Sequence, residues 1–242
     1  MLTGPPQPSE PPAGGPGSAL LDLVAVMDRL RSECPWDARQ THESLVPYLL
    51  EETYETLEAI ERHDEAELRG ELGDVLLQVL FHARIAAERT DGTGFTIDDV
   101  ARGIADKLVR RHPHVFADVS VSGADEVKRN WEAIKAEERA AAAAMSGEGT
   151  SSALEGVPMT QPALSLAAQL QRRAMSAGAP AELAELAPDE HGARDGVSEI
   201  GAELFALVAA ARSAGVDPEL ELRRAARAFR DRFEAWEQSA GR

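Results

Sequence analysis

Apolar residues recur along most of this chain at spacings of three and four, which places them on one face of an α-helix. No run alternates apolar and polar residues over the length that a β-strand needs. The pattern therefore predicts an all-α fold. In the first part of the chain, the predicted helices span about residues 19–33, 44–62, 64–88, 96–112 and 125–144.

Local signals set the ends of these helices. Pro35 ends the first helix, and Ser44 is the expected N-cap of the second, which places Pro47 in its first turn. Asp64 and Thr96, each followed three residues later by an acid, begin the next two helices.

Composition divides the chain into four segments. Residues 1–18 are rich in proline and glycine and are expected to form a flexible tail, whereas residues 19–144 form a first helical domain. Residues 145–162 read as a linker, and three shorter helical patterns over residues 163–242 predict a second helical module.

Charge and composition limit the possible functions. The chain has 25 basic and 42 acidic residues, so its formal net charge of −17 argues against binding a nucleic-acid polymer. It has a single cysteine, Cys34, no apolar run of membrane-spanning length and no secretory signal at its start. We therefore expect a cytoplasmic protein with no membrane contact.

Five acidic residues stand at helical spacings on two consecutive predicted helices. Glu51 and Glu55 are four residues apart with Glu52 beside them, and Glu71 and Asp74 are three apart. Each pair shares a helix face.

The link between these helices is very short and centred near His63, which predicts an antiparallel hairpin. Glu55 and Glu71 are each eight residues from this centre, and Glu52 and Asp74 are each eleven residues from it. At the rise of an α-helix, these pairs lie at matching heights of about 12 and 16 Å from the turn. The carboxylates converge if the two faces point toward each other.

Converging carboxylates repel, and a divalent cation reverses the sign of that interaction. Ligands that are all oxygen favour Mg²⁺, or Mn²⁺ as a second possibility. The alternative is a solvated acidic face, because residues 51–74 hold ten acids against two arginines. Gly73 and Asp74 interrupt an apolar run and favour a site. A di-iron centre is excluded, because no glutamate has a histidine three residues later.

A basic and aromatic set follows the acidic one. Lys107, Arg110 and Arg111 close the fourth predicted helix, where they would either stabilise its C-terminal dipole or neutralise a polyphosphate. Trp131 and Lys135 share a face of the fifth helix. Trp131 would either fill the core or stack on a base while Lys135 reaches a phosphate.

Taken in order, these motifs resemble the MazG family of nucleoside triphosphate pyrophosphohydrolases, over about residues 20–140. The motifs that carry the resemblance are Cys34-Pro35-Trp36-Asp37, Gln40-Thr41, Leu50-Glu51-Glu52-x-x-Glu55, Glu71-x-x-Asp74, Asp106-Lys107-Leu108-x-Arg110-Arg111-His112-Pro113-His114-Val115-Phe116 and Trp131-Glu132-x-x-Lys135.

The resemblance implies an all-α fold related to dimeric dUTPases. It implies Mg²⁺ held by the acidic motifs while water attacks the α-phosphorus, giving a nucleoside monophosphate and pyrophosphate. Two groups of residues carry over to this sequence. Glu51, Glu52, Glu55, Glu71 and Asp74 would bind metal or orient the water, and Lys107, Arg110, Arg111, Trp131 and Lys135 would contact the nucleotide. Burial of the acidic face predicts a homodimer, in which two hairpins complete a four-helix arrangement.

The second half resembles the second module of the two-module members of this family, but its acidic motifs are reduced. Its acidic motifs are Ala181-Glu182-Leu183-Ala184-Glu185 and Glu199-Ile200-Gly201-Ala202, which keep three of the five carboxylates. We therefore expect a degenerate module that binds no metal productively and serves a structural or dimer-stabilising role.

The function expected from these features is Mg²⁺-dependent hydrolysis of ribo- and deoxynucleoside triphosphates, as house-cleaning of the nucleotide pool. One alternative is a non-catalytic helical protein whose acidic face docks a basic partner. Another is a narrower pyrophosphatase that acts on a nucleotide conjugate.

Overall fold

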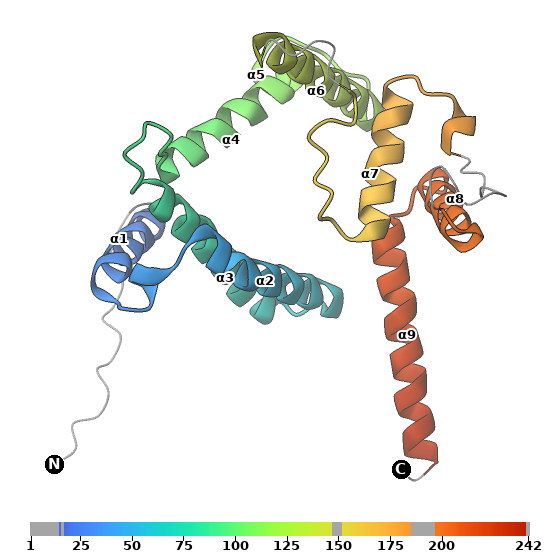
Figure 1. Ribbon diagram of the computed structural model, residues 1–242, viewed down its shortest axis with the longest axis horizontal. Helices are drawn as coiled ribbons and strands as arrows, with labels where there is room; N and C mark the ends of the chain where they lie inside the picture. Colours follow the sequence, from blue (N-terminus) through green and yellow to red (C-terminus); the bar gives the residue numbers. More distant parts are fainter. Residues whose placement is uncertain (1–14, 16, 147–151, 185–196, 241–242) are drawn as a thin grey trace. The chain divides into compact units, whose positions relative to one another are not determined.

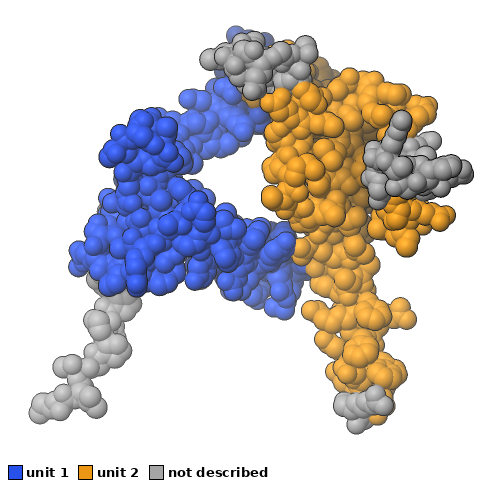
Figure 2. Space-filling model, viewed as in Figure 1, with its two compact units in different colours: residues 1–120 blue, residues 121–242 orange. Residues whose placement is uncertain are grey.

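The computed structural model describes residue 15 and residues 17–146, 152–184 and 197–240. These residues form helices and turns and include no strand, so the all-α prediction is confirmed for them. They belong to two compact units, residues 1–120 and 121–242, each of which is described by itself (Figure 2). The predicted tail falls almost entirely outside the described residues, as does part of the predicted linker.

The first unit is built around an antiparallel pair of long helices, α2 and α3, which lie side by side (Figure 1). Its elements are α1 (Ser18–Glu33), the short 3-10 helix η1 (Asp37–Arg39), α2 (His42–Arg62), α3 (Glu65–Ala86), α4 (Ile97–Arg111) and α5 (Pro113–Phe116).

The start of α2 differs from the prediction. The N-cap is Thr41 rather than Ser44: the Thr41 hydroxyl accepts from the Ser44 backbone N–H at 3.2 Å, and the Thr41 N–H donates to the Ser44 hydroxyl at 2.9 Å. This reciprocal pair is a capping box in which serine fills the place usually held by Glu or Gln. The helix therefore begins at His42, and Pro47 lies inside it rather than in its first turn.

The other predicted helix starts are confirmed. Asp64 caps α3 by accepting from the backbone N–H groups of Ala66 and Glu67, each at 3.0 Å. Thr96 caps α4 in a capping box with Asp99, and α4 ends just before Pro113.

The core of the first unit lies where α1 crosses the hairpin at the end away from its turn. Met27 of α1, Leu45 of α2, and Leu80 and Phe81 of α3 are each at most 5% exposed. Ile97 at the start of α4 packs against this cluster. The core therefore fixes one end of the hairpin and leaves the turn end outside it.

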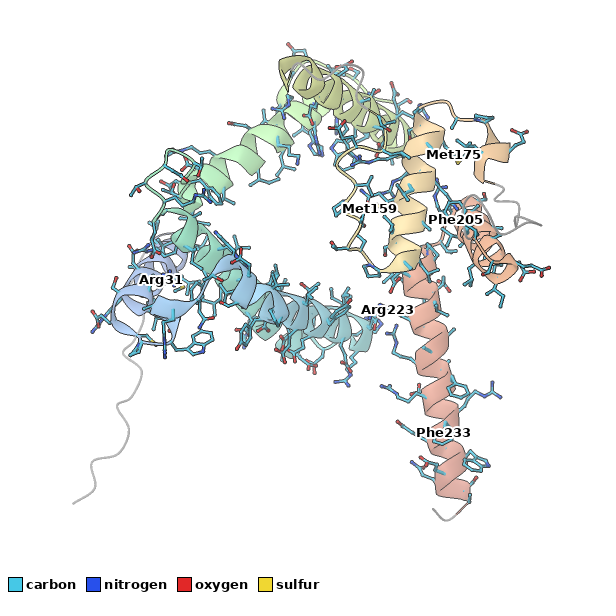
Figure 3. All side chains as sticks on the ribbon, in the orientation of Figure 1. Arg31, Met159, Met175, Phe205, Arg223 and Phe233 are labelled. Carbon is cyan, nitrogen blue, oxygen red and sulfur yellow. The ribbon has the colours of Figure 1, made fainter. Side chains whose placement is uncertain are left out.

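The second unit contains four further α-helices and a short 3-10 turn among its described residues. They are α6 (Ala124–Ser146), α7 (Ala163–Ser176), η2 (Ala181–Ala184), α8 (Glu199–Ser213) and α9 (Pro218–Ser239). The buried Gln171 of α7 donates to the carbonyl of Phe205 on α8 at 2.8 Å, which ties these two helices together. Phe205 is labelled in Figure 3.

This division of the chain assigns α6 to the second unit, whereas the sequence pattern ends the first domain after that helix. The functional domain boundaries stay a prediction. None of the described helices is both long and apolar enough to cross a membrane.

Candidate functional site

The turn between α2 and α3 has the length that the register argument requires. α2 ends at Arg62, and His63 adopts a left-handed conformation with φ 56°, which reverses the chain before α3 begins at Glu65. Histidine is one of the non-glycine residues that tolerate this conformation better than most. The hairpin therefore aligns the two acidic helix faces.

Three carboxylates meet on this hairpin. Glu52 and Glu55 of α2 and Glu71 of α3 each offer an oxygen atom, and these atoms all lie within 4.8 Å of one another. Glu51 and Asp74, both exposed, flank this acidic cluster. The structure thus gathers the acidic motifs that the spacing predicted would converge.

The electrostatics of the acidic cluster are those of crowded, partly desolvated acids. Burial raises the pKa of Glu52, and the negative charges of its neighbours, with Asp74 first, raise it further. Burial also raises the pKa of Glu71, followed by the charges of Glu55 and Asp74. Both shifts mean that the ionised cluster is destabilised unless a positive charge balances it.

One residue of the acidic cluster carries an unsatisfied atom. Oε2 of Glu71 is buried and has no hydrogen-bond partner among the described residues. A buried carboxylate oxygen without a donor is costly, and either a proton or a cation removes that cost. A set of carboxylate oxygens is the donor set that hard divalent cations prefer, so these residues fit Mg²⁺.

The basic residues of α4 are not gathered into the acidic cluster. Lys107 and Arg110 are exposed and Arg111 is half-buried, on a helix that leads away from the α2–α3 pair (Figure 1). The charges that shift the pKa values of Glu52 and Glu71 all come from other carboxylates. A role for this basic set in binding nucleotide stays a prediction.

Trp131 and Lys135 do contact each other on α6. The Lys135 ammonium lies 4.6 Å from the centre of the Trp131 ring and 3.1 Å from a carboxylate oxygen of Glu132. This arrangement belongs to the second unit, so its role toward a nucleotide stays a prediction.

Sequence reasoning missed an aromatic contact between the loop before α2 and the hairpin. Trp36, in the loop before α2, packs edge-on against Tyr48 of α2 at 5.8 Å and Phe81 of α3 at 6.4 Å between ring centres. It also missed Gln78, which is 5% exposed and whose Oε1 has no hydrogen-bond partner among the described residues. The available signal was spacing, because Gln78 follows Asp74 by one helical turn and shares its face.

Comparison with known proteins identifies the family. Residues 40–116 match the model of the MazG nucleotide pyrophosphohydrolase domain. A nucleoside triphosphate pyrophosphohydrolase/pyrophosphatase MazG of Thermotoga maritima is 42% identical, covering 92% of this chain and 87% of the relative. The chain belongs to the MazG family.

Other relatives agree with this assignment. A nucleoside triphosphate pyrophosphohydrolase of Escherichia coli K12 is 43% identical over 87% of this chain and 84% of its own length. An uncharacterized 26.1 kDa protein of Streptomyces cacaoi is 48% identical over 92% of this chain and 84% of its own length. The resemblance read from the motifs is confirmed, as is the expectation of an enzyme of the MazG class.

The match to the MazG domain covers α2 to α5. It therefore includes all five motif carboxylates and the basic end of α4, but it ends before α6. Trp131 and Lys135 therefore lie outside the matched domain, although the full-length relatives align across most of the chain.

Proposed function

We propose that this MazG protein hydrolyses ribo- and deoxynucleoside triphosphates to nucleoside monophosphates and pyrophosphate, with Mg²⁺ as the metal. The observation that carries the proposal is the meeting of Glu52, Glu55 and Glu71, where one buried oxygen of Glu71 has no donor within the described ranges. These three, with Glu51 and Asp74 beside them, would hold the metal.

The chemistry follows from phosphate charge. A bound divalent cation offsets the charge of the triphosphate and lowers the pKa of water. A water oxygen forms a bond to the α-phosphorus, the bond from that phosphorus to the α–β bridging oxygen breaks, and pyrophosphate leaves. A carboxylate of the acidic cluster accepts the proton of the water.

The test is pyrophosphate release from a panel of canonical and oxidised ribo- and deoxynucleoside triphosphates, with Mg²⁺ or with EDTA. Wild type should release pyrophosphate with the monophosphate as co-product, only with Mg²⁺. Glu71→Gln should lose most of the activity, whereas Glu58→Gln should match wild type, because Glu58 is an exposed acid of α2 that pairs with Arg62. Release of single phosphate would move the cut to another bond.

The panel also tests the physiological role. We propose that the enzyme clears unwanted nucleotides from the cytosolic pool, so an oxidised nucleotide should be cut at least as efficiently as its canonical parent. Absence of hydrolysis with every nucleotide, canonical or oxidised, would favour the alternatives, a docking surface or a nucleotide conjugate as substrate.

We also propose a homodimer. Leu50 and Tyr54 of α2 and Leu72 of α3 are 43–52% exposed on the hairpin that carries the acidic cluster, so one chain leaves apolar surface there uncovered. Sedimentation should give twice the chain mass. A fully active monomer would contradict this proposal.

A further inference from the structure

The loop between α1 and α2 holds an aromatic side chain against the hairpin. Trp36 contacts one residue from each helix, Tyr48 of α2 and Phe81 of α3, and yet it remains 46% exposed. A tryptophan that is fixed at its edges but open to solvent presents a surface to a ligand or a partner.

The helix spacing relates this surface to the acidic cluster. Tyr48 precedes Glu52 by four residues, about 6 Å along α2, and Phe81 follows Asp74 by seven residues, about 10 Å along α3. Each pair lies on one helix face. Trp36 therefore borders the acidic face on the side away from the turn, one to two helical turns from the carboxylates, which is comparable to the span from the α-phosphorus to the base of a nucleotide.

One arginine fastens this loop. The Arg31 side chain is 10% exposed, and its Nη1 donates to the backbone carbonyls of Asp37 and Gln40, the latter at 2.9 Å. Its Nε and Nη2 donate to the two carboxylate oxygens of Glu88, both at 2.8 Å. Gln40 in turn donates from its amide to the carbonyl of Trp36 at 2.9 Å. An unbroken chain of hydrogen bonds thus runs from Glu88 through Arg31 and Gln40 to Trp36.

Only an arginine can make this set of contacts. Its planar guanidinium donates along one edge to a carboxylate and along another to carbonyls, whereas a lysine offers a single point charge. Arg31 is labelled on α1 in Figure 3, and Glu88 lies just beyond the end of α3. The contacts therefore join three segments at the base of the loop.

We propose that Arg31, anchored by Glu88, is a positioning residue for nucleotide binding: it fixes the loop so that Trp36 forms the wall against which the nucleobase packs. This inference rests on the proposed hydrolysis of nucleoside triphosphates. Arg31 acts through Trp36 and touches neither the metal nor the phosphates.

The chain offers a matched control. Arg84 of α3 also bonds Glu88, at 3.0 Å, and pairs with Asp28 of α1, but the structure records no bond from it to the loop. Arg31→Lys should raise KM at least about fivefold and leave kcat nearly unchanged, because misplacement of a binding wall weakens substrate positioning. Arg84→Lys should leave both constants near wild type. Equal KM values for Arg31→Lys and wild type would overturn the proposal.

A double-mutant cycle separates positioning from general stability. Trp36→Ala alone should raise KM, and adding Arg31→Lys to it should have little further effect, because both changes remove the same wall. Additive effects on KM would contradict action through Trp36. If Arg31→Lys does not fold, Glu88→Gln, which weakens the anchor and keeps the loop bonds, should show a smaller rise in KM than Trp36→Ala.

A binding readout distinguishes failure of this inference from failure of the proposed function. The chain has three tryptophans, so labelling with 5-fluorotryptophan gives three ¹⁹F resonances, and Trp36→Phe assigns one. α,β-Methylene ATP, which resists cleavage at the α–β bond, should shift the Trp36 resonance with Mg²⁺ present, and Arg31→Lys should weaken this binding. If wild type hydrolyses nucleotides but the analogue does not shift the Trp36 resonance, the proposed packing of the base on Trp36 is wrong and the proposed function stands. If wild type neither binds the analogue nor hydrolyses nucleotides, the proposed function itself is wrong.

Discussion

The two ends of the α2–α3 hairpin are built from the same helices but differ in burial and in charge. At the end away from the turn, Leu45 and Phe81 are buried in an apolar core with α1. Toward the turn, the facing positions are taken by Glu52, Glu55 and Glu71, and among the described residues of this half only Ala59 is fully buried.

The contrast indicates a division of labour within one supersecondary unit. The packed end supplies the stability that lets the other end keep like charges within a few ångströms of each other. Functional sites often break local folding rules while the surrounding structure compensates. The ends should therefore respond in opposite ways to substitution and to pH.

The largest expected effect is on the stability of the packed end. Phe81→Ala should lower the free energy of unfolding by about 3–5 kcal/mol, because it removes a buried ring and leaves a cavity. Ile60→Ala, at a position of α2 near the turn that is 49% exposed, should change it by less than about 0.5 kcal/mol. Urea denaturation measures both variants, and similar losses of stability in the two would contradict the contrast.

At the acidic end, the next largest effect is on activity. Glu71→Gln should lower pyrophosphate release by roughly 100- to 1,000-fold, as expected for loss of a group that acts on the transition state, without lowering the melting temperature. Glu199→Gln, the corresponding acid of the second module, should keep wild-type activity. Loss of activity in both variants would mean that the second module is not degenerate.

The acidic end could be predicted from sequence because its geometry is local. The short turn at His63 and the number of residues between it and each carboxylate determine which carboxylates lie level with each other along the hairpin. This argument needs no knowledge of distant packing. The N-cap of α2 was predicted at the wrong residue because Ser44 and Thr41 both carry capping hydroxyls, and only the backbone conformation decides between them.

The other end could not be predicted in the same way. The contact of Arg31 with Glu88 joins residues 57 positions apart, and that of His42 with His82 joins residues 40 apart. Each depends on how α1 and the loop pack on the hairpin, which helical periodicity does not determine. The aromatic contacts of Trp36 were missed for the same reason.

The two ends should also respond oppositely to pH. The pKa of Glu52 is raised above its ordinary value of 4.5, so the folded state binds more protons than the unfolded state just above pH 4.5. The contribution of Glu52 to the free energy of unfolding is fully present below pH 4.5 and is lost as the pH rises through the raised pKa. In EDTA, Glu52→Gln should therefore melt a few degrees above wild type at pH 7 and level with it near pH 4. If the difference in melting temperature between the two proteins stays constant from pH 4 to pH 7, repulsion between Glu52 and its acidic neighbours does not explain it.

At the packed end, the sign reverses and the effect is the smallest expected. The ring nitrogens Nδ1 of His42 and His82 lie 2.8 Å apart, a distance at which one proton can be shared. Nε2 of His82 is buried and has no hydrogen-bond partner in the described part of the chain. Burial lowers the pKa of His82 from 6.5, and the charge of His42 lowers it further.

The unfolded state thus binds more protons than the folded state below pH 6.5, and stability is lost as pH falls from 6.5 through the lowered pKa of His82. Carboxylates with depressed pKa values, such as Glu88, act below pH 4.5 and stay outside this window. The urea midpoint of wild type should fall between pH 7.5 and pH 5.5 by more than that of His82→Phe, which keeps an aromatic ring but cannot titrate. If the urea midpoints of the two proteins fall equally between pH 7.5 and pH 5.5, the histidine pair contributes only packing. The two ends of the hairpin would then not differ in how protonation affects their stability.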